Sequence, residues 1–379
     1  MNAQDYAQDL IRFDSVSNLS NQLVSQYLDD ALQTLGFETE IVPYRDSQDV
    51  LKVNVVARKG PRGEGGLAYF AHSDVVPAAD WHDSEHGPFD PRIDGDRLYG
   101  RGSCDMKGSI ASMLAAVSQR AKTSFDRPLY VVVTADEEVG FHGARWVSLN
   151  SAIYEEIRDG KAAGIIGEPT MLEVVIAHKG SRGMRIVSHG EAAHSSGTAG
   201  KNANLAMIPF LSEMLAIYQE TETETRWQNP LFDPPTLSWN IGINDGNTAL
   251  NVKAPQSVCT IYFRGMPDVD AGPLVERTRA AAQRYGLEWS LFAQAEPFTI
   301  SPEAEIVGTM LRLTGSNSPK RVCYGTDAAV FSELQNLVVC GPGDVAKAHT
   351  RDEWITLDQL QRGTEFFGKA IDHYCLGGA

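Results

Sequence analysis

The chain has 379 residues and a mass of 41.4 kDa, which is long for one hydrophobic core and short for three, so two domains are expected. With 42% hydrophobic and 22% charged residues, its composition disfavours disordered, fibrous and membrane proteins. Forty-nine acidic residues against 33 basic ones give a net charge of −16, which argues against binding to nucleic acid or to anionic membrane surfaces.

The amino-terminal residues, MNAQDYAQDL, lack both the basic segment and the apolar segment of a secretory signal. No run of the chain approaches the ~18 apolar residues that a membrane span requires. The five cysteines are scattered and show no Cys-x-x-Cys spacing, so neither a disulfide framework nor a thiolate zinc site is indicated. We therefore expect a cytoplasmic protein with reduced cysteines.

The first half of the chain alternates between predicted helices and predicted strands. A helical spacing of apolar residues over 3–36 ends at Gly36, and residues 51–57 alternate as a strand does. Further strands are predicted at 67–71, 128–135 and 162–167, with helices after Gly108 and from about residue 143. This alternation is typical of an α/β domain whose mostly parallel sheet is covered by helices on both faces.

From about residue 180 the pattern changes. Residues 181–190 and 257–266 alternate in the manner of antiparallel strands, and one apolar helix is predicted between them at 204–218. This middle segment is typical of an α+β domain. Its boundaries are predicted at residues 180 and 290.

After about residue 290 the first pattern returns. A helix is predicted near 303–314, a buried strand at 336–341 and a terminal helix from about residue 357. We therefore expect a discontinuous α/β domain, residues 1–179 and 291–379, interrupted by a smaller α+β domain at 180–290.

Two histidines and several carboxylates follow the predicted strands or stand in a glycine-rich loop. In an open α/β sheet, ligands bind beyond the carboxyl ends of the strands, so these side chains are expected to meet at one edge. The loop GRGSCDMKG contributes one of them at the start of a helix. The residues are His72, Asp74, Asp105, Glu137, Glu138, Glu168 and His349.

Mixed imidazole and carboxylate ligands suit zinc or another first-row divalent ion. Two ions about 3.5 to 4 Å apart need a bridging carboxylate, so a histidine and a terminal carboxylate for each ion, with one shared aspartate, make a plausible ligand set. Of the neighbours Glu137 and Glu138, one can bind metal while the other acts as a general base. Asp74, two residues after His72, is expected to orient that imidazole.

Each of these signals has a simpler interpretation when it is considered alone. A His-x-Asp sequence at a strand end is more often a hydrogen-bonded turn, and a Glu-Glu pair usually lies on a solvated surface. Glu168-Pro169 can be the start of a loop. Together, at the same end of strands that should be buried, they favour a metal site.

Six stretches along the chain carry a family resemblance: AHSDVVP, YGRGSCDMKG, TADEEVG, GEPT, AHSSG and KAHTRDEW. In this order they resemble the motifs of the M20 metallopeptidases, especially the group of acetylornithine deacetylases and succinyl-diaminopimelate desuccinylases. They span nearly the whole chain. The resemblance also implies a cis peptide after the bridging aspartate, at Asp105-Met106.

The resemblance implies a role for each member of the set. One divalent ion would be held by His72 and Glu168, a second by Glu138 and His349, and Asp105 would bridge them. The ions would be Zn²⁺, for which Co²⁺ can substitute. Glu137 would be the general base, and Asp74 would orient His72.

The resemblance implies that the discontinuous α/β domain is the catalytic, metal-binding domain and that the inserted domain is a lid and dimerisation domain, which also carries motifs of the family. His194, in EAAHSSG, matches a histidine that reaches across a homodimer into the partner's active site and stabilises the oxyanion, although a surface turn is its simpler interpretation. Asn251 and Arg264 resemble the pair that holds the substrate's α-carboxylate, although an arginine on a strand is ordinarily solvated. Gly325 and Thr326, in YGTDAAVF, resemble the substrate loop.

The resemblance implies hydrolysis of a small N-acyl L-amino acid. N-acetyl-L-ornithine, a substrate of arginine biosynthesis, is the first expectation because of the segments GEPT, VIAHKG and GPGDVAKAH. Desuccinylation of N-succinyl-diaminopimelate is the second, and a carboxypeptidase or dipeptidase the third. A metal-free scaffold protein is the alternative from another class; it predicts loss of a ligand or of the base, and none is lost.

Overall fold

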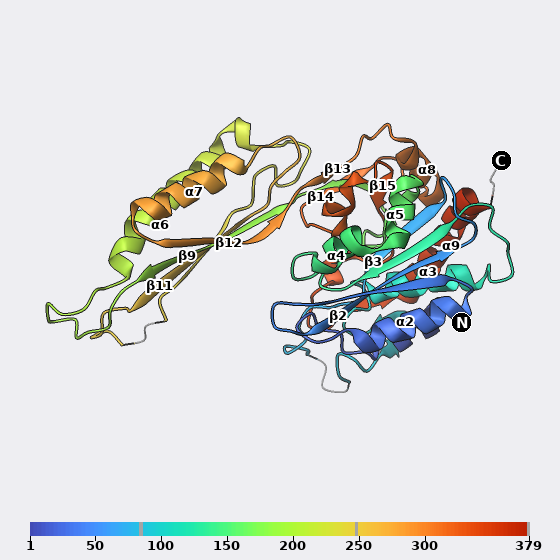
Figure 1. Ribbon diagram of the computed structural model, residues 1–379, viewed down its shortest axis with the longest axis horizontal. Coiled ribbons are helices and arrows are strands. Elements are labelled where there is room, and N and C mark those ends of the chain that lie inside the picture. The colour runs from blue at the N-terminus through green and yellow to red at the C-terminus, as the bar shows by residue number, and fades with distance from the viewer. Residues whose placement is uncertain (83–85, 247–248, 377–379) are drawn as a thin grey trace. The chain divides into compact units, whose positions relative to one another are not determined.

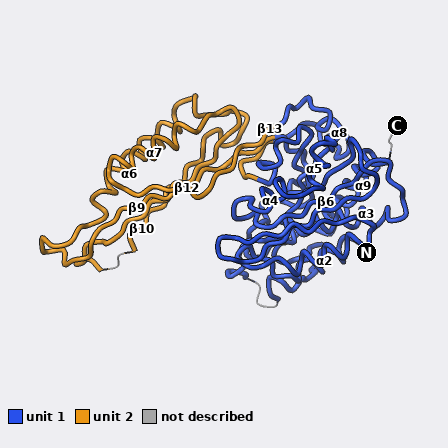
Figure 2. The backbone as a smooth tube through the Cα atoms, in the orientation of Figure 1, with its two compact units in different colours: residues 1–176, 300–320, 326–379 blue, residues 177–299, 321–325 orange. Residues whose placement is uncertain are grey.

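The computed structural model of the protein describes residues 1–82, 86–246 and 249–376. The chain forms two compact units (Figure 2), of which unit 1 comprises residues 1–176, 300–320 and 326–379, and unit 2 comprises residues 177–299 and 321–325. Residues 291–295 belong to unit 2 because strand β12 (Glu288–Ala295) pairs with β9 (Ser181–His189) in one antiparallel sheet.

The helices and strands of unit 1 alternate along the chain. Its helices are α1 (Ala3–Ile11), α2 (Gln22–Thr34), α3 (Lys107–Ser118), α4 (His142–Asn150), α5 (Ala152–Asp159), α8 (Glu305–Thr314) and α9 (Leu357–Cys375). Its strands are β1 (Glu38–Arg45), β2 (Leu51–Lys59), β3 (Leu67–His72), β4 (Arg92–Asp94), β5 (Arg97–Tyr99), β6 (Leu129–Thr134), β7 (Ala163–Ile166), β15 (Leu337–Val339) and β16 (Trp354–Thr356). Three strands lie at the boundary of the units: β8 (Val175–His178), β13 (Phe298–Thr299) and β14 (Lys320–Val322).

The main sheet has the strand order β1-β2-β6-β3-β7-β15-β8-β13, with β14 paired to β8. Its central strands β6, β3, β7 and β15 run parallel, while β1 and β2 on one side and β8 and β13 on the other pair antiparallel. Every residue of β3, β6 and β7 is buried, as expected for strands covered on both faces. The predicted α/β class is confirmed, and the parallel strands lie at its centre.

Helices cover both faces of this sheet (Figure 1). Adjacent residues of β3 show it directly, because successive side chains of a strand point to opposite faces. The ring of Tyr69 packs 5.1 Å from that of Phe367 in α9, whereas Phe70 packs 4.6 Å from Phe331. Phe331 in turn contacts Tyr154 of α5 at 5.2 Å. The sheet is therefore the middle of three layers.

The predicted helical stretch over residues 3–36 is in fact two helices, α1 and α2. The segment between them leaves the helical conformation to bind the end of β3. Ser15 Oγ donates to the carbonyl of Ser73 at 2.7 Å, and Ser17 N donates to the carbonyl of Val75 at 3.1 Å. These contacts with a distant strand outweigh the local apolar spacing, and they attach the amino terminus to the sheet edge where the polar residues gather.

Unit 2 is an antiparallel sheet in the order β10-β11-β9-β12, where β10 is Asn240–Asn244 and β11 is Gln256–Phe263. Helices α6 (Asn204–Thr223) and α7 (Gly272–Arg284) pack on one face of it (Figure 1). The alternating burial along β11 gives the sheet one apolar face and one solvated face. The α+β character expected for the middle of the chain is confirmed. Among the described helices, none combines the length and apolarity needed to span a bilayer.

Candidate metal centre and active site

The polar residues follow the carboxyl ends of the central parallel strands. His72 is the last residue of β3, the acidic turn Asp136–Glu138 follows β6, and Glu168 follows β7. Parallel neighbours end at the same edge of a sheet, so these segments are brought together there. The separation of 3.7 Å between His72 Nε2 and Glu168 Oε1 is a direct result.

Asp105 lies between the two histidines. Its Oδ1 is 3.1 Å from His72 Nε2, and its Oδ2 is 3.3 Å from His349 Nε2. His349 Nε2 also lies 2.9 Å from Glu138 Oε1. One carboxylate thus faces two imidazoles through its two different oxygens, which is the arrangement that a bridging ligand needs.

The potential ligand atoms fall into two overlapping groups. In each group, one ligand atom from every residue lies within 4.8 Å of those from the others. One group holds His72, Glu137 and Glu168, and the other holds His72, Asp105 and Glu138. His349, through its contacts with Asp105 and Glu138, joins the second group. All five expected ligands and the expected base therefore lie in one cluster.

The electrostatics of this cluster favour a bound cation. Burial, with the charge of Glu168, raises the pKa of Glu137 well above its ordinary value. Burial and the charge of Asp105 raise the pKa values of Glu168 and Glu138 in the same way. Buried carboxylates that repel one another need positive charge nearby, and divalent cations supply it. The donor set of two imidazoles and four carboxylates therefore fits first-row divalent ions.

The two imidazoles supply part of that positive charge in the chain itself. Burial alone would raise the pKa of Asp105, yet its hydrogen bonds with His349 and His72 hold that pKa well below its ordinary value. The hydrogen bonds of His349 with Asp105 and with Glu138 raise the pKa of His349 to about 10. Metal binding would therefore displace protons from the histidines, since a ligating imidazole is neutral.

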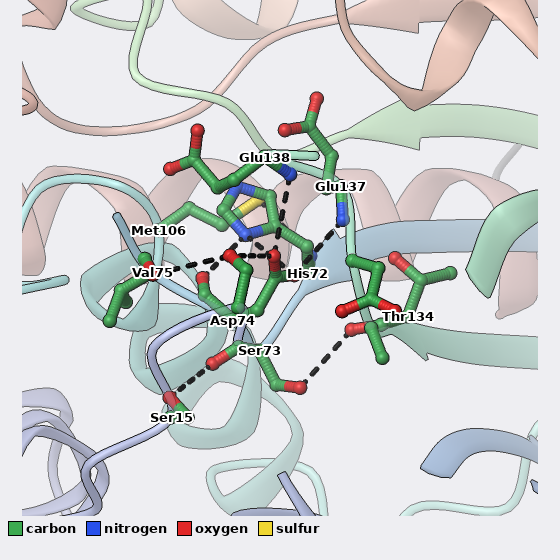
Figure 3. Close-up of polar contacts among 12 residues, drawn as sticks. Ser15, His72, Ser73, Asp74, Val75, Met106, Thr134, Glu137 and Glu138 are labelled. Carbon is green, nitrogen blue, oxygen red and sulfur yellow. Dashed lines mark hydrogen bonds and ion pairs between the residues drawn. The ribbon is translucent and has the colours of Figure 1, made fainter. Parts of the chain in front are cut away.

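Asp74 acts on the site in a way that its spacing from His72 does not predict. The contact with His72 Nδ1, at 2.9 Å, is made by the backbone carbonyl of Asp74, while the Asp74 carboxylate is 3.7 Å away. That carboxylate instead accepts the backbone N–H groups of Glu137 at 3.1 Å and Glu138 at 3.3 Å. Figure 3 shows both glutamate side chains extending away from Asp74 while their amide nitrogens face it. Asp74 thus holds the acidic turn as well as the imidazole.

The loop that carries Asp105 lies against β3. The peptide between Asp105 and Met106 is cis, as the family resemblance predicts. The backbone N–H of His72 donates to the sulfur of Met106 at 3.3 Å, a contact drawn in Figure 3. The residue after the bridging aspartate therefore also contacts the strand that supplies the first histidine.

Several buried polar residues around the cluster have partners that the sequence does not reveal. Asp136, whose φ is +57°, accepts the phenol of Tyr44 at 2.6 Å and forms an ion pair with Lys52 at 2.9 Å. Ser17 Oγ donates to the Asp74 carboxylate at 2.7 Å. The TADEEVG motif marks Asp136, but its partners come from β1 and β2, far away in the sequence, so local spacing could not have identified them.

The expected residues of the inserted domain lie in unit 2. His194 is exposed and its Nδ1 is 2.7 Å from Ser196 Oγ. Asn251 lies beside it, because the Ser195 N–H donates to the Asn251 carbonyl at 2.8 Å. The half-buried Arg264 follows β11 and lies 5.0 Å from the ring centroid of Tyr262.

The expected substrate loop joins the two units. Gly325 belongs to unit 2, whereas Thr326 is the first buried residue of the segment that returns to unit 1. Thr326 Oγ1 accepts the N–H of Ala328 at 3.1 Å, which caps a short 3₁₀ turn, Asp327–Ala329. The hydroxyl of Thr326 therefore has a structural partner within its own turn.

Comparison with known proteins gives concordant matches. Residues 68–373 match the family model described as peptidase family M20/M25/M40. The chain is 31% identical to an acetylornithine deacetylase of Yersinia pestis, over 96% of this chain and 93% of the relative. It is 32% identical to an acetylornithine deacetylase of Myxococcus xanthus, over 97% and 96%.

Solved structures share the fold at low sequence identity. An M20 family metallo-carboxypeptidase from Sulfolobus solfataricus superposes with a TM-score of 0.77 at 16% identity, over 98% of each chain. A di-peptidase from Saccharomyces cerevisiae superposes with a TM-score of 0.75 at 14% identity, over 98% of this chain and 95% of that one. These likenesses support the two-unit α/β and α+β architecture.

Proposed function

The chain belongs to peptidase family M20/M25/M40, and from this premise we propose that it is a dinuclear metal hydrolase that removes the acyl group of an N-acyl L-amino acid. Membership makes it a hydrolase of amide bonds, and the family name of metallopeptidase implies a divalent metal. The observation that carries the dinuclear proposal is Asp105, whose two oxygens face His72 and His349 separately.

The proposed metal ligands divide around that carboxylate. His72 and Glu168 would hold one ion, Glu138 and His349 the other, and Asp105 would bridge them. Zn²⁺ is the proposed ion because it accepts nitrogen and carboxylate oxygen together, and Co²⁺ suits the same donors. When bound, such ions polarise an amide carbonyl and lower the pKa of water towards ~7.

Glu137 is the proposed general base. Its carboxylate belongs to the group formed with His72 and Glu168, yet none of the five proposed ligand positions requires it. Held by its backbone N–H to Asp74, it would take a proton from the attacking water and pass it to the leaving amine. His194 of a second copy of the chain, reaching across a dimer, would donate a hydrogen bond to the tetrahedral oxyanion.

N-acetyl-L-ornithine is the proposed substrate, because the relatives compared above are acetylornithine deacetylases. Arg264 and Asn251 would bind its α-carboxylate, since a guanidinium presents two parallel donors to a carboxylate. Gly325 and Thr326 would lie along the substrate. N-succinyl-diaminopimelate and dipeptides are the competing substrates within the family.

A substrate panel with a base variant tests this function. The chain loaded with Zn²⁺ or Co²⁺ should hydrolyse N-acetyl-L-ornithine faster than N-succinyl-diaminopimelate or dipeptides. Glu137→Gln should bind the metals but lose about 10²- to 10⁴-fold in kcat. Glu155→Gln, an exposed change on α5, is the control and should retain full activity. A chain that holds no metal and cleaves none of the substrates would be a scaffold instead.

We further propose that unit 2 forms a homodimer. Helix α6 exposes an apolar stripe, with Leu205 69%, Ile208 59% and Leu215 51% exposed, and neighbouring Ile243 of β10 is 62% exposed. In the part of the chain that the structure describes, β10 is an edge strand paired with β11 alone. A second copy could cover the stripe and continue the sheet by two-fold symmetry.

Sedimentation of the purified chain tests the dimer. The unmodified chain should sediment as a dimer at micromolar concentration, and Ile208→Lys should sediment as a monomer because it places a charge in the apolar stripe. Leu149→Lys, at an 81% exposed position on α4 of unit 1, should leave the dimer intact. A monomeric unmodified chain would refute this proposal.

A further inference from the structure

Glu353 is one of the buried carboxylates of unit 1 that lie outside the proposed ligand set. Glu353 is fully buried immediately before β16, four residues after His349 in the chain. A buried charge is costly unless hydrogen bonds and an opposite charge compensate it. The groups that hydrogen-bond to Glu353 therefore indicate the role of its buried charge.

Those partners belong to the loop of the bridging aspartate. Glu353 Oε1 accepts two backbone N–H groups, that of Cys104 at 2.9 Å and that of Asp105 at 3.0 Å. Its other oxygen, Oε2, accepts Arg101 Nη1 at 2.9 Å. The side chain of Arg101 is itself only 1% exposed. Both carboxylate oxygens are thus used to hold residues 101–105.

The same ion pair reaches the loop after His72. Arg101 Nη2 donates to the carbonyl of Pro77 at 3.3 Å, and its guanidinium lies 5.7 Å from the ring centroid of Trp81. The backbone of Glu353 takes part as well, because its carbonyl accepts the N–H of Gly100 at 3.0 Å. Arg101 and Glu353 therefore connect three segments, which carry His72, Asp105 and His349.

Electrostatic repulsion opposes this arrangement. Glu353 is buried beside the negative charge of Asp105, and its hydrogen bonds with the two N–H groups and with Arg101 act against that repulsion. An apolar side chain could fill the same space without placing another carboxylate beside an acidic cluster. An apolar side chain could not accept the N–H groups of Cys104 and Asp105, whereas the carboxylate of Glu353 accepts both.

We propose that Glu353, paired with Arg101, is a positioning residue of the metal centre, which holds the Asp105 loop so that the two carboxylate oxygens face His72 and His349. The inference rests on the proposed dinuclear function. Glu353 touches no substrate and would act only through Asp105. Removal of the Glu353 carboxylate should therefore lower the affinity for metal at the site that Asp105 bridges, and should affect the stability of the fold less.

Titration of the metal-free chain with Co²⁺ tests the inference, with calorimetry and the visible spectrum of bound Co²⁺ as readouts. Glu353→Gln keeps the size of the side chain, but its NH₂ group is a donor and would face either the Arg101 guanidinium or the two N–H groups, which are donors too. Glu353→Asp keeps the charge but withdraws the carboxylate from those donors. Glu156→Gln is the matched control, since that carboxylate pairs with Arg58 and Arg62 in the same unit, outside the ligand cluster.

The unmodified chain and Glu156→Gln should bind two Co²⁺ ions. Both Glu353 variants should bind the second ion about 10- to 100-fold more weakly, with an altered Co²⁺ spectrum and an unchanged circular dichroism spectrum. Two ions bound by a folded Glu353 variant as tightly as by the control would overturn the inference and leave the proposed function intact.

The inference can also be judged if the chain does not bind two ions or if a variant does not fold. If the unmodified chain does not bind two ions, the dinuclear function fails and the inference fails with it. If Glu353→Gln does not fold, Glu353→Asp provides the measurement. If neither variant folds even with saturating Co²⁺, Glu353 serves the fold and not the metal centre, which also overturns the inference.

Discussion

Asp327 is a buried acid whose carboxylate lies beside a threonine hydroxyl. Its Oδ2 is 2.7 Å from Thr134 Oγ1, and that hydroxyl is also 3.1 Å from the carbonyl of Ala71. Thr134 has one hydroxyl proton to donate, either to the Asp327 carboxylate or to the carbonyl of Ala71. Burial raises the pKa of Asp327 to about 7, although the hydrogen bond from Thr134 acts to lower it.

Replacement of Asp327 should change how stability depends on pH. Because its folded pKa of about 7 exceeds its ordinary value of 3.8, the folded chain holds an extra proton, and stability is lost as pH rises through that interval. In chelator, Asp327→Asn should reduce this loss by on the order of 1–3 kcal/mol, measured by urea unfolding between pH 4 and pH 8. Asp358→Asn, at an exposed position, is the control. Parallel curves for Asp327→Asn and the unmodified chain would contradict the assignment.

At the scale of elements, β15 and β7 together determine where Glu168 lies. The two strands pair in parallel from Leu337↔Gly164 to Val339↔Ile166. Just beyond them, a Cβ on Gly341 would overlap the carbonyl of Gly167 and lie 2.7 Å from that of Glu168. The carbonyl of Gly341 also accepts the N–H of Leu172 at 2.9 Å. Glycine at 341 therefore permits the close approach that places a proposed ligand.

Gly341→Ala should disturb both stability and the metal centre. The added methyl group meets backbone, which cannot rotate away, so the unfolding free energy should fall by about 1–3 kcal/mol. Co²⁺ affinity, measured by titration, should fall too, because the Glu168 segment must shift. Gly63→Ala adds a methyl group with no neighbour within 4 Å and is the control. Equal stability of the two variants would contradict this prediction, because it would show that the backbone of Gly167 and Glu168 can move away from the added methyl group at little cost.

At the scale of the whole molecule, part of the net charge of −16 is concentrated in the metal centre. The pKa values of Glu137, Glu138 and Glu168 are raised above their ordinary 4.5, and that of His349 is raised to about 10. All four groups bind more protons in the folded chain than in the unfolded chain. The metal-free protein should therefore lose stability as pH rises from about 4.5 through about 10. The lowered pKa of Asp105 makes stability fall as pH falls, but this effect is confined to pH values below its ordinary pKa of 3.8.

Divalent metal should reverse this trend. In chelator, the Tm should decrease steadily from pH 5 to pH 9. With Zn²⁺ at about 100 times its Kd, stability should rise by about 2.7 kcal/mol, and more at higher pH because bound metal displaces protons. Scanning fluorimetry with and without Zn²⁺ measures both effects. A Tm that does not respond to Zn²⁺ at any pH would count against the whole site.

The elements that the sequence predicts are those whose signal is local. The strands β3, β6 and β7 are continuous apolar runs, and α9 begins at Leu357, as the apolar pattern of the terminal segment predicts. Strand β12 has an irregular, mostly exposed burial pattern, so periodicity does not reveal it. The break between α1 and α2 depends on bonds to the end of β3, made by residues that lie 58 positions further along the chain.

The sequence by itself determined the α/β class and the residues that gather at the sheet edge, because strand burial and strand ends are properties of short segments. Only the tertiary structure decided how those residues pair. Glu138 meets His349 across 211 positions, and Glu353 holds Asp105 across 248. Spacing along the chain carries no information about contacts that packing creates between distant segments, and for that reason the supporting residues were found only in the structure.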